Sequence, residues 1–461
     1  MESLLIKNGD IVTAIDQLNA DIYIENGLIQ AIGKDLDFSA DRQIDAQGHY
    51  VFPGAIDAHV HLELPVMDTV SADDFETGTA AGIAGGTTSI IDFVTPNRGQ
   101  SLLGALHERK DAARKAVSDY AFHMAVIGFD PHTAQEMEQC VINEGIPSFK
   151  TFLAYKETIG IEDQALIEVM KTAKKLGALV TSHCENGDLI PELQKQLIDV
   201  GKTDPQYHAQ SRPSFIEEEG THKAITFART VGVPLYIVHV TCREAVETII
   251  KARAAGQTVF GETCPQYLLL DDSVYDKPGF QSAAYVMSPP IRPKGHQKSL
   301  WEALKAGQIQ TVATDHCPFQ LHGQKDMGKD DFRNIPNGAA GIENRLALMY
   351  TYGVLEQKLT LKQFVEVNST RPAQLFGMYP QKGTICAGAD ADLVIWNPDT
   401  ENTISAKTCH HRCDTSIFEG FQTKGAPTWV IVNGKVQWDE GNLNVERGAG
   451  RYIHRNPGSS L

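Results

Sequence analysis

The two ends of the chain share one pattern, in which apolar and polar residues alternate over short stretches. Residues 21–24 alternate and lead into the Asn-Gly pair at 26–27, and residues 428–432 lead into a second Asn-Gly pair at 433–434. A period of two is typical of half-buried strands, and Asn-Gly favours a two-residue hairpin turn. We therefore predict that both ends pair into one small β-sandwich domain. This domain comprises residues 1–50 and 380–447.

Between these ends, residues 51–379 alternate short apolar, β-branched runs with segments of helical periodicity. After Asp163, for example, apolar residues fall on one helical face, and Gly177 can end the helix. Eight candidate strands separated by helices predict an α/β fold, a (β/α)8 TIM barrel whose active site lies at the carboxyl ends of its strands. The candidate strands are residues 50–61, 87–94, 120–127, 148–155, 179–185, 235–240, 258–269 and 310–317.

Two further segments are predicted to lie in solvent. Residues 448–461 contain several Gly, Pro and Ser, and we expect them to form an extended, loosely held C-terminal tail. Residues 325–333 follow the eighth strand and read KDMGKDDFR, so we expect a solvated loop segment. Such loops also border the active sites of barrels.

Composition and charge narrow the range of partners. The 461 residues are 42% hydrophobic, which is enough for a large core, and their net charge of −17 disfavours nucleic acid and anionic membranes. No run approaches the roughly 18 apolar residues of a membrane helix. The eight cysteines form no CxxC pair, and the N-terminus shows no charged leader followed by an apolar stretch. We expect a cytoplasmic protein that acts on a small molecule.

Several predicted strand ends carry residue types that bind metal ions. His59 and His61 end the first strand two residues apart, so both imidazoles point to the same face. Such nitrogen and oxygen ligands suit zinc or a neighbouring divalent first-row ion, and six of them fit two ions that share a bridge. The other four candidates lie on strands four, five, six and eight. They are Lys150, His183, His239 and Asp315.

Lys150 does not suit this set as an ordinary lysine. Its cationic ammonium would face two divalent ions, which costs several kcal/mol even at a generous effective dielectric constant. We therefore expect some chemistry that removes its charge or its proton.

The chain resembles the hydantoinase/dihydropyrimidinase family of cyclic amidohydrolases over essentially its whole length. Matching segments, in order, include GAIDAHVHLELP, SFKTFLAYK, HCENGDLI, PLYIVHV, SPPIRP, ATDHCPF and GKDDFRNIPNGAAGIENR. The resemblance implies that CO2 carboxylates Lys150 and that the resulting carbamate, an anion, bridges two Zn2+ ions. This removes the electrostatic objection. The resemblance assigns one ion to His59, His61 and Asp315, and the other to His183 and His239.

The resemblance also implies roles around the substrate. Asp315 would take the proton of a hydroxide held between the ions and deliver it to the leaving nitrogen. Tyr155 would donate its phenol to the developing oxyanion. Main-chain groups of Ser288 and Asn337 would hold the imide edge of the ring. The implied reaction opens hydantoins or dihydropyrimidines to N-carbamoyl amino acids, in an enzyme that forms a homotetramer or dimer.

Three other functions are weighed against this one. A dihydroorotase usually has an arginine after the paired histidines to bind its carboxylate substrate, and here Glu63 disfavours it. An allantoinase typically has Glu-Pro-Gly there, and this chain reads Glu63-Leu64-Pro65, so this alternative stays open. A non-catalytic dihydropyrimidinase-like scaffold protein would have lost metal ligands, whereas all six ligand positions are present here.

Overall fold

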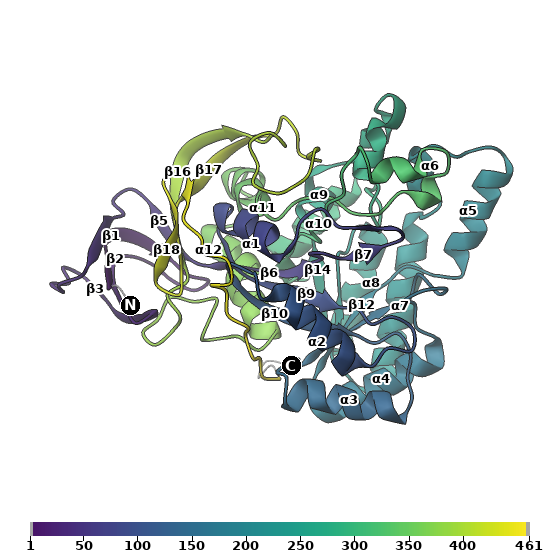
Figure 1. Cartoon of the computed structure of the whole chain (residues 1–461), viewed down its shortest axis with the longest axis horizontal. Coiled ribbons are helices and arrows are strands. Elements are labelled where there is room, and N and C mark those ends of the chain that lie inside the picture. The colour runs from purple at the N-terminus through teal and green to yellow at the C-terminus, as the bar shows by residue number, and fades with distance from the viewer. Residues whose placement is uncertain (1–2, 458–461) are drawn as a thin grey trace.

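The computed structural model describes residues 3–457 and divides them among two large sheets, a small hairpin and surrounding helices. The hairpin pairs β7 (Pro65–Val66) with β8 (Thr69–Val70). Figure 1 shows strands from both chain ends at one side of the molecule and the helix-covered barrel at the other. Eight parallel strands follow one another around the barrel in sequence order, as predicted. These strands are β6 (Ala55–Val60), β9 (Thr87–Val94), β10 (Asp119–Ala125), β11 (Ser148–Phe152), β12 (Leu179–His183), β13 (Leu235–Ile237), β14 (Val259–Thr263) and β15 (Thr311–Val312).

Contacts between the first and eighth strands close the barrel. Val60 forms a parallel bridge with His316, just beyond β15. Arg345 is fully buried, and its Nη1 donates to the carbonyls of Ile56 and Val312, each at 2.8 Å. One guanidinium therefore fastens both strands at the seam. The predicted (β/α)8 barrel is confirmed.

Helices cover the outside of the barrel. The predicted helix after Asp163 is present: its apolar face is buried, and Gly177 ends it in the left-handed conformation at φ 64°. None of the helices among residues 3–457 is long and apolar enough to cross a membrane. The α-helices are α1 (Phe75–Ala84), α2 (Leu102–Ala113), α3 (Pro131–Ile142), α4 (Asp163–Leu176), α5 (Leu189–Asp199), α6 (Gln206–Gln210), α7 (Ser214–Val231), α8 (Arg243–Ala254), α9 (Pro265–Leu269), α10 (His296–Lys305), α11 (Arg345–Met349), α12 (Leu361–Val365) and α13 (Arg371–Leu375). Shorter 3-10 and π turns are η1 (Asp272–Asp276), η2 (Gly279–Tyr285), η3 (Lys325–Gly328), η4 (Phe332–Asn334), η5 (Tyr350–Leu355) and η6 (Glu366–Thr370).

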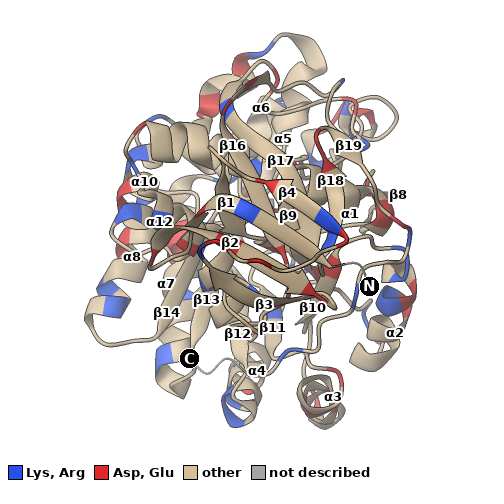
Figure 2. Ribbon diagram, turned by 90° about the vertical axis from the view of Figure 1, so that its left-hand side faces the viewer, with Lys and Arg blue, Asp and Glu red and all other residues tan. Residues whose placement is uncertain are grey.

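Strands from both chain ends form one continuous, mostly antiparallel sheet, which supports the β domain expected from the two Asn-Gly patterns. Both Asn-Gly pairs form hairpin turns with positive φ, between β2 and β3 and between β17 and β18. On this side of the molecule, Lys and Arg residues are interspersed with Asp and Glu (Figure 2). The strands are β1 (Leu4–Val12), β2 (Gln17–Glu25), β3 (Leu28–Gly33), β4 (Arg42–Asp45), β5 (Tyr50–Pro53), β16 (Leu393–Thr403), β17 (Gln422–Val432), β18 (Lys435–Asp439) and β19 (Asn442–Leu443).

Several predicted strands are shorter in the structure, and two of them divide into separate elements. Residues 50–61 form two strands in different sheets, because β5 pairs with β1 and β16 whereas β6 belongs to the barrel. The chain passes between the sheets at Gly54, where a Cβ would lie 2.1 Å from Oγ1 of Thr88. Residues 258–269 also divide, because Pro265 begins α9 directly after β14.

The C-terminal tail is held more firmly than the sequence suggested. Tyr120 forms two main-chain hydrogen bonds with the tail. Its N–H donates to the carbonyl of Arg451 at 2.9 Å, and its carbonyl accepts from the N–H of Ile453 at 2.8 Å. Arg455 is fully buried and donates to the carbonyls of Phe122 and Phe376. The expectation of a loosely held tail is therefore wrong for its described part, because a buried guanidinium fixes it to the barrel.

Candidate metal centre

The predicted site residues converge on one cavity of about 510 Å³ at the carboxyl ends of the barrel strands. His59, Lys150 and His183 lie within β6, β11 and β12, and His61, His239 and Asp315 lie just beyond their strands. Convergence at this end is the arrangement expected of a barrel enzyme. The cavity is lined by all nine predicted residues: His59, His61, Lys150, Tyr155, His183, His239, Ser288, Asp315 and Asn337.

Three of these residues form a compact set of metal-ligand atoms. Oδ1 of Asp315 lies 3.3 Å from Nε2 of His59 and 3.2 Å from Nε2 of His61. Burial alone would raise the pKa of Asp315, but the neighbouring His59 and His61 hold it well below its usual range. Burial lowers the pKa of His59. An ionised carboxylate beside a neutral imidazole is the donor chemistry that a divalent first-row ion needs.

His183 and His239 form a second set nearby. Nδ1 of His183 lies 3.0 Å from Nε2 of His239, and both rings are almost completely buried. Burial lowers the pKa of both groups, so their ring nitrogens are neutral. Two converging imidazole nitrogens suit a metal ion, although this pair supplies only two ligands by itself.

Lys150 is buried in the same cavity without an ionic partner. Its Nζ lies 4.8 Å from the ring centre of Phe93 and 5.1 Å from that of Phe152. No hydrogen bond or ion pair of its Nζ is found among residues 3–457. Burial lowers the pKa of Lys150 to about 8. Roughly a tenth of this amine is therefore neutral at pH 7, and a reaction with CO2 requires the neutral form.

Three of the nine cavity residues adopt left-handed backbone conformations. The φ angles of Tyr155, His239 and Asp315 are 58°, 39° and 54°. Non-glycine residues in this region cost of order 1–3 kcal/mol each, and they concentrate at functional sites where the surrounding structure imposes them. The barrel therefore holds these side chains in orientations that the free chain disfavours.

Two buried carboxylates behind the histidines were missed from the sequence. Glu262 accepts from Nδ1 of His59 at 2.7 Å, so His59 presents Nε2 to the cavity. Glu185 lies 2.8 Å from Nε2 of His183, so that ring presents Nδ1 instead. Glu185 was visible as the second residue after a site histidine, whereas Glu262 has no local signal because it lies 203 positions from His59.

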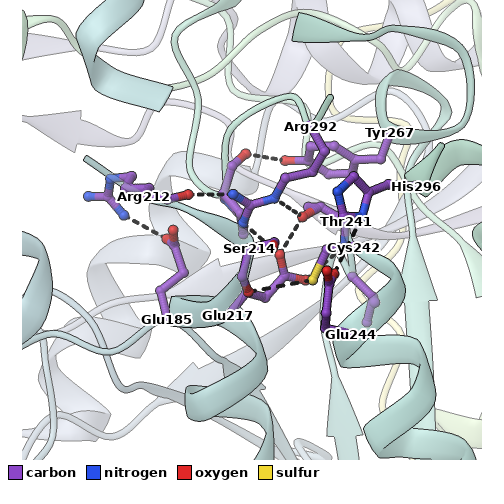
Figure 3. A network of polar contacts seen from close by, with 12 residues as sticks. Glu185, Arg212, Ser214, Glu217, Thr241, Cys242, Glu244, Tyr267, Arg292 and His296 are labelled. Carbon is purple, nitrogen blue, oxygen red and sulfur yellow. Dashed lines mark hydrogen bonds and ion pairs between the residues drawn. The ribbon is translucent and has the colours of Figure 1, made fainter. Parts of the chain in front are cut away.

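Glu185 belongs to a buried polar network behind the cavity (Figure 3). Nη1 of Arg212 donates to Glu185 at 2.6 Å, and the main-chain carbonyl of Arg212 accepts from Arg292. Arg292 in turn binds Glu217 at 2.8 Å. The guanidinium of Arg212 also lies 5.5 Å from the ring centre of Tyr155. This network therefore links one histidine of the second set to the predicted oxyanion donor.

The segments that carry Ser288 and Asn337 are joined beneath the cavity. Gly338 N donates to Val286 O at 3.0 Å. At Gly338, with φ 140°, a Cβ would lie 2.2 Å from the carbonyl oxygen of Cys317, so this close approach requires glycine. Lys325 also donates to Val286 O, so the expectation that residues 325–333 are solvated is wrong for this lysine, which is 1% exposed.

Comparisons with known proteins agree with this geometry. The model of the amidohydrolase family matches residues 50–437. A D-hydantoinase of Geobacillus stearothermophilus is 48% identical over 452 residues, covering 98% of this chain and 96% of that protein. A dihydropyrimidinase of Arabidopsis thaliana is 44% identical, covering 99% and 86%. The crystal structure of dihydropyrimidinase from Brevibacillus agri superposes with a TM-score of 0.98 at 46% identity, covering 99% of both chains.

Proposed function

The chain belongs to the amidohydrolase family, within its hydantoinase and dihydropyrimidinase group, and from this premise we propose that it hydrolyses cyclic ureides. The reaction opens the amide bond of a hydantoin or dihydropyrimidine ring and gives an N-carbamoyl amino acid. The observation that carries the proposal is the convergence of six ligand-type groups with Tyr155, Ser288 and Asn337 in one cavity.

We propose that the cavity holds two Zn2+ ions or neighbouring divalent ions, bridged by Lys150 after its carboxylation. His59, His61 and Asp315 would hold one ion, and His183 and His239 the other. Bound ions of this kind polarise an amide carbonyl and lower the pKa of water to about 7. In the carboxylation, the neutral amine of Lys150 forms an N–C bond to CO2 and releases one proton. The lowered pKa of Lys150, about 8, supports this step.

The remaining steps fall to side chains of the cavity. Asp315 is ionised, so it can accept a proton from the attacking water and return it to the ring nitrogen as the amide bond breaks. Tyr155 keeps its proton because burial raises its pKa, and its phenol donates to the oxyanion. Main-chain groups of Ser288 and Asn337 bind the imide edge of the ring.

The domain boundaries, the oligomeric state and the cellular location also stay predictions. We propose that residues 51–379 form the catalytic domain and residues 1–50 and 380–447 the β domain, with β5 as the strand that joins them. The expected homotetramer or dimer and the cytoplasmic location are likewise predictions.

The test is a panel of kcat/KM measurements on metal-replete protein. The rings are dihydrouracil, hydantoin, allantoin, dihydroorotate and both enantiomers of an aryl hydantoin. We expect turnover of hydantoin or dihydrouracil. Preference for allantoin would favour an allantoinase, and absence of ring opening in the whole panel would overturn the proposal. Metal analysis distinguishes the enzyme from the non-catalytic scaffold alternative, because a scaffold that has lost its metal site contains no stoichiometric metal.

Dihydroorotate is in the panel because of the position of Glu63. The sequence suggested that this carboxylate would repel an anionic substrate. In the structure, Glu63 pairs instead with Lys115 at 2.6 Å. The carboxylate is thereby neutralised, so the discrimination against dihydroorotate needs a direct measurement.

A further inference from the structure

Lys325 is a buried lysine outside the metal centre that no carboxylate neutralises among the described residues. It begins η3, in the loop after β15, and is 1% exposed. Its Nζ donates to the carbonyls of Val286 at 2.9 Å and Pro336 at 3.1 Å. Burying an amine with two carbonyl acceptors and no counter-ion stabilises a fold poorly.

The two acceptors belong to the segments that are expected to bind the substrate ring. Val286 lies two residues before Ser288, and Pro336 directly precedes Asn337. These segments are far apart in sequence, and the amine of Lys325 joins them without lining the cavity itself. Their spacing is set by this side chain, by the hydrogen bond from Gly338 N to Val286 O, and by the buried apolar cluster that contains both Val286 and Ile335.

We propose that Lys325 is a positioning residue that helps to set the distance between the main-chain groups of Ser288 and Asn337, and thereby the affinity for the imide edge of the ring. The proposal rests on the proposed function, because it assigns the ring to these two segments. Lys325 touches neither the ring nor a metal ligand. Its removal is therefore expected to weaken ring binding and to leave the metal centre assembled.

The charge around Lys325 supports a role other than stabilisation. The titratable groups that bear on Lys325 are the imidazole of His208 and the thiols of Cys413 and Cys317. Burial lowers the pKa of His208 to about 3 and raises the pKa of both thiols, so none of the three carries a charge near neutral pH. Burial lowers the pKa of Lys325 to about 7. The buried lysine Lys382, by contrast, lies within 3.0 Å of three aspartates. A buried amine without such partners costs stability. The contact of Lys325 with the two binding segments gives a functional reason for its burial.

The test compares wild-type protein with Lys325→Met, which keeps the apolar stem and removes both hydrogen bonds. Three quantities are measured: KM and kcat for the best ring substrate, the competitive inhibition constant of imidazolidin-2-one, and bound metal per chain. Imidazolidin-2-one carries the ureide N–H and C=O groups but no scissile amide. We expect KM and the inhibition constant to rise together by about tenfold, the size expected for two lost hydrogen bonds, with unchanged metal content.

Lys174→Met is the matched control. Lys174 lies on α4, outside the cavity lining, and its Nζ likewise donates to a main-chain carbonyl, that of Val231, at 2.7 Å. This variant should leave all three quantities unchanged. If Lys325→Met does not fold, Lys325→Gln serves instead, because it keeps amide donors on a shorter side chain and should show a smaller rise.

The outcomes separate the two proposals. An inhibition constant within about twofold of the wild type in an active variant overturns the role of Lys325 and leaves the proposed function intact. Loss of metal from the variant would also overturn it, because Lys325 would then support the metal centre. Wild-type protein that opens no ring overturns the proposed function, and the role of Lys325 with it.

Discussion

The two ends of the barrel each enclose a buried lysine, and the two lysines have opposite surroundings. At the carboxyl end, Lys150 lies against two aromatic rings and forms no ion pair with a carboxylate of the described residues, and burial lowers its pKa to about 8. At the amino end, Lys382 lies 2.8 Å from Asp119, 3.0 Å from Asp390 and 2.5 Å from Asp392. Burial alone would lower the pKa of Lys382, but these aspartates raise it above its ordinary value.

The difference shows how one residue type serves two purposes. Three aspartates keep Lys382 protonated, so this lysine acts as a fixed charge that fastens the segment before β16 to Asp119, the first residue of β10. Lys150 forms no ion pair with a carboxylate among residues 3–457, so burial lowers its pKa and its amine loses its proton more easily than that of Lys382. The arrangement of neighbouring charges, and not burial itself, decides which lysine is structural and which is reactive.

The largest effect is expected from removal of the reactive lysine. Lys150→Met should lower kcat/KM by about a thousandfold or more, because the bridging ligand of both ions is lost. Bound metal, measured by atomic emission, should fall well below two ions per chain. A variant that keeps both metals and more than about a tenth of the activity would contradict the bridging role of Lys150.

Removal of the structural lysine should act on stability instead. Lys382→Met removes a cation shared by three buried aspartates. Asp119 and Asp390 keep Arg451 as a partner, whereas Asp392 loses its ion pair. Breaking this buried network costs about 3–5 kcal/mol of unfolding free energy. Urea unfolding measures this loss, and metal analysis of the folded variant should still give the wild-type value. If metal were lost in proportion to stability, the two ends of the barrel would not be independent.

A smaller effect is expected behind the second histidine set. Glu185→Gln keeps an oxygen that can accept from His183 and Arg212 but removes the negative charge. Metal affinity should fall by about tenfold, as for other carboxylates behind ligating histidines. Competition with a chelator measures it. Glu219→Gln, at an exposed glutamate bound to Asn186, is the control and should leave the affinity unchanged.

The smallest effect concerns pH. The pKa of Lys325 is lowered to about 7 in the folded protein from its ordinary value of 10.5, so between these values the unfolded chain binds more protons. Stability therefore rises with pH in this window, by at most about 1.4 kcal/mol per pH unit. Lys325→Met should lack this contribution. Urea unfolding of both proteins at about pH 7, 8 and 9 measures the difference, and parallel curves would show that Lys325 is not the group that titrates.

The sequence predicted those parts of the site that depend on local spacing. His59 and His61 lie two residues apart at a strand end, and the period of a strand alone places both on one face. Glu262 could not be found in this way, because its contact with His59 depends on how β14 packs in the barrel. Lys325 was misjudged because its exposed neighbours, such as Asp326 and Lys329, dominate the composition of the loop.

The sequence also predicted the type of each sheet better than its boundaries. Residues 50–61 are buried almost throughout, so their apolar pattern does not reveal that the chain changes sheets within them. Gly54 was the only local signal, and its need for close contact with Thr88 is visible only in the folded structure. The tail was misjudged for a similar reason. Arg455 is a charged residue, which suggests exposure, but its side chain is fully buried in the structure.

The terminal sheet has a consequence for synthesis on the ribosome. Strand β5 pairs with β16, which lies near the other end of the sequence. While the barrel is being translated, the edge of β5 that later pairs with β16 therefore stays unpaired. Such edges invite pairing with other chains. Newly made chains should thus be most prone to aggregation before residues 393–403 emerge, and most dependent on chaperones in that interval.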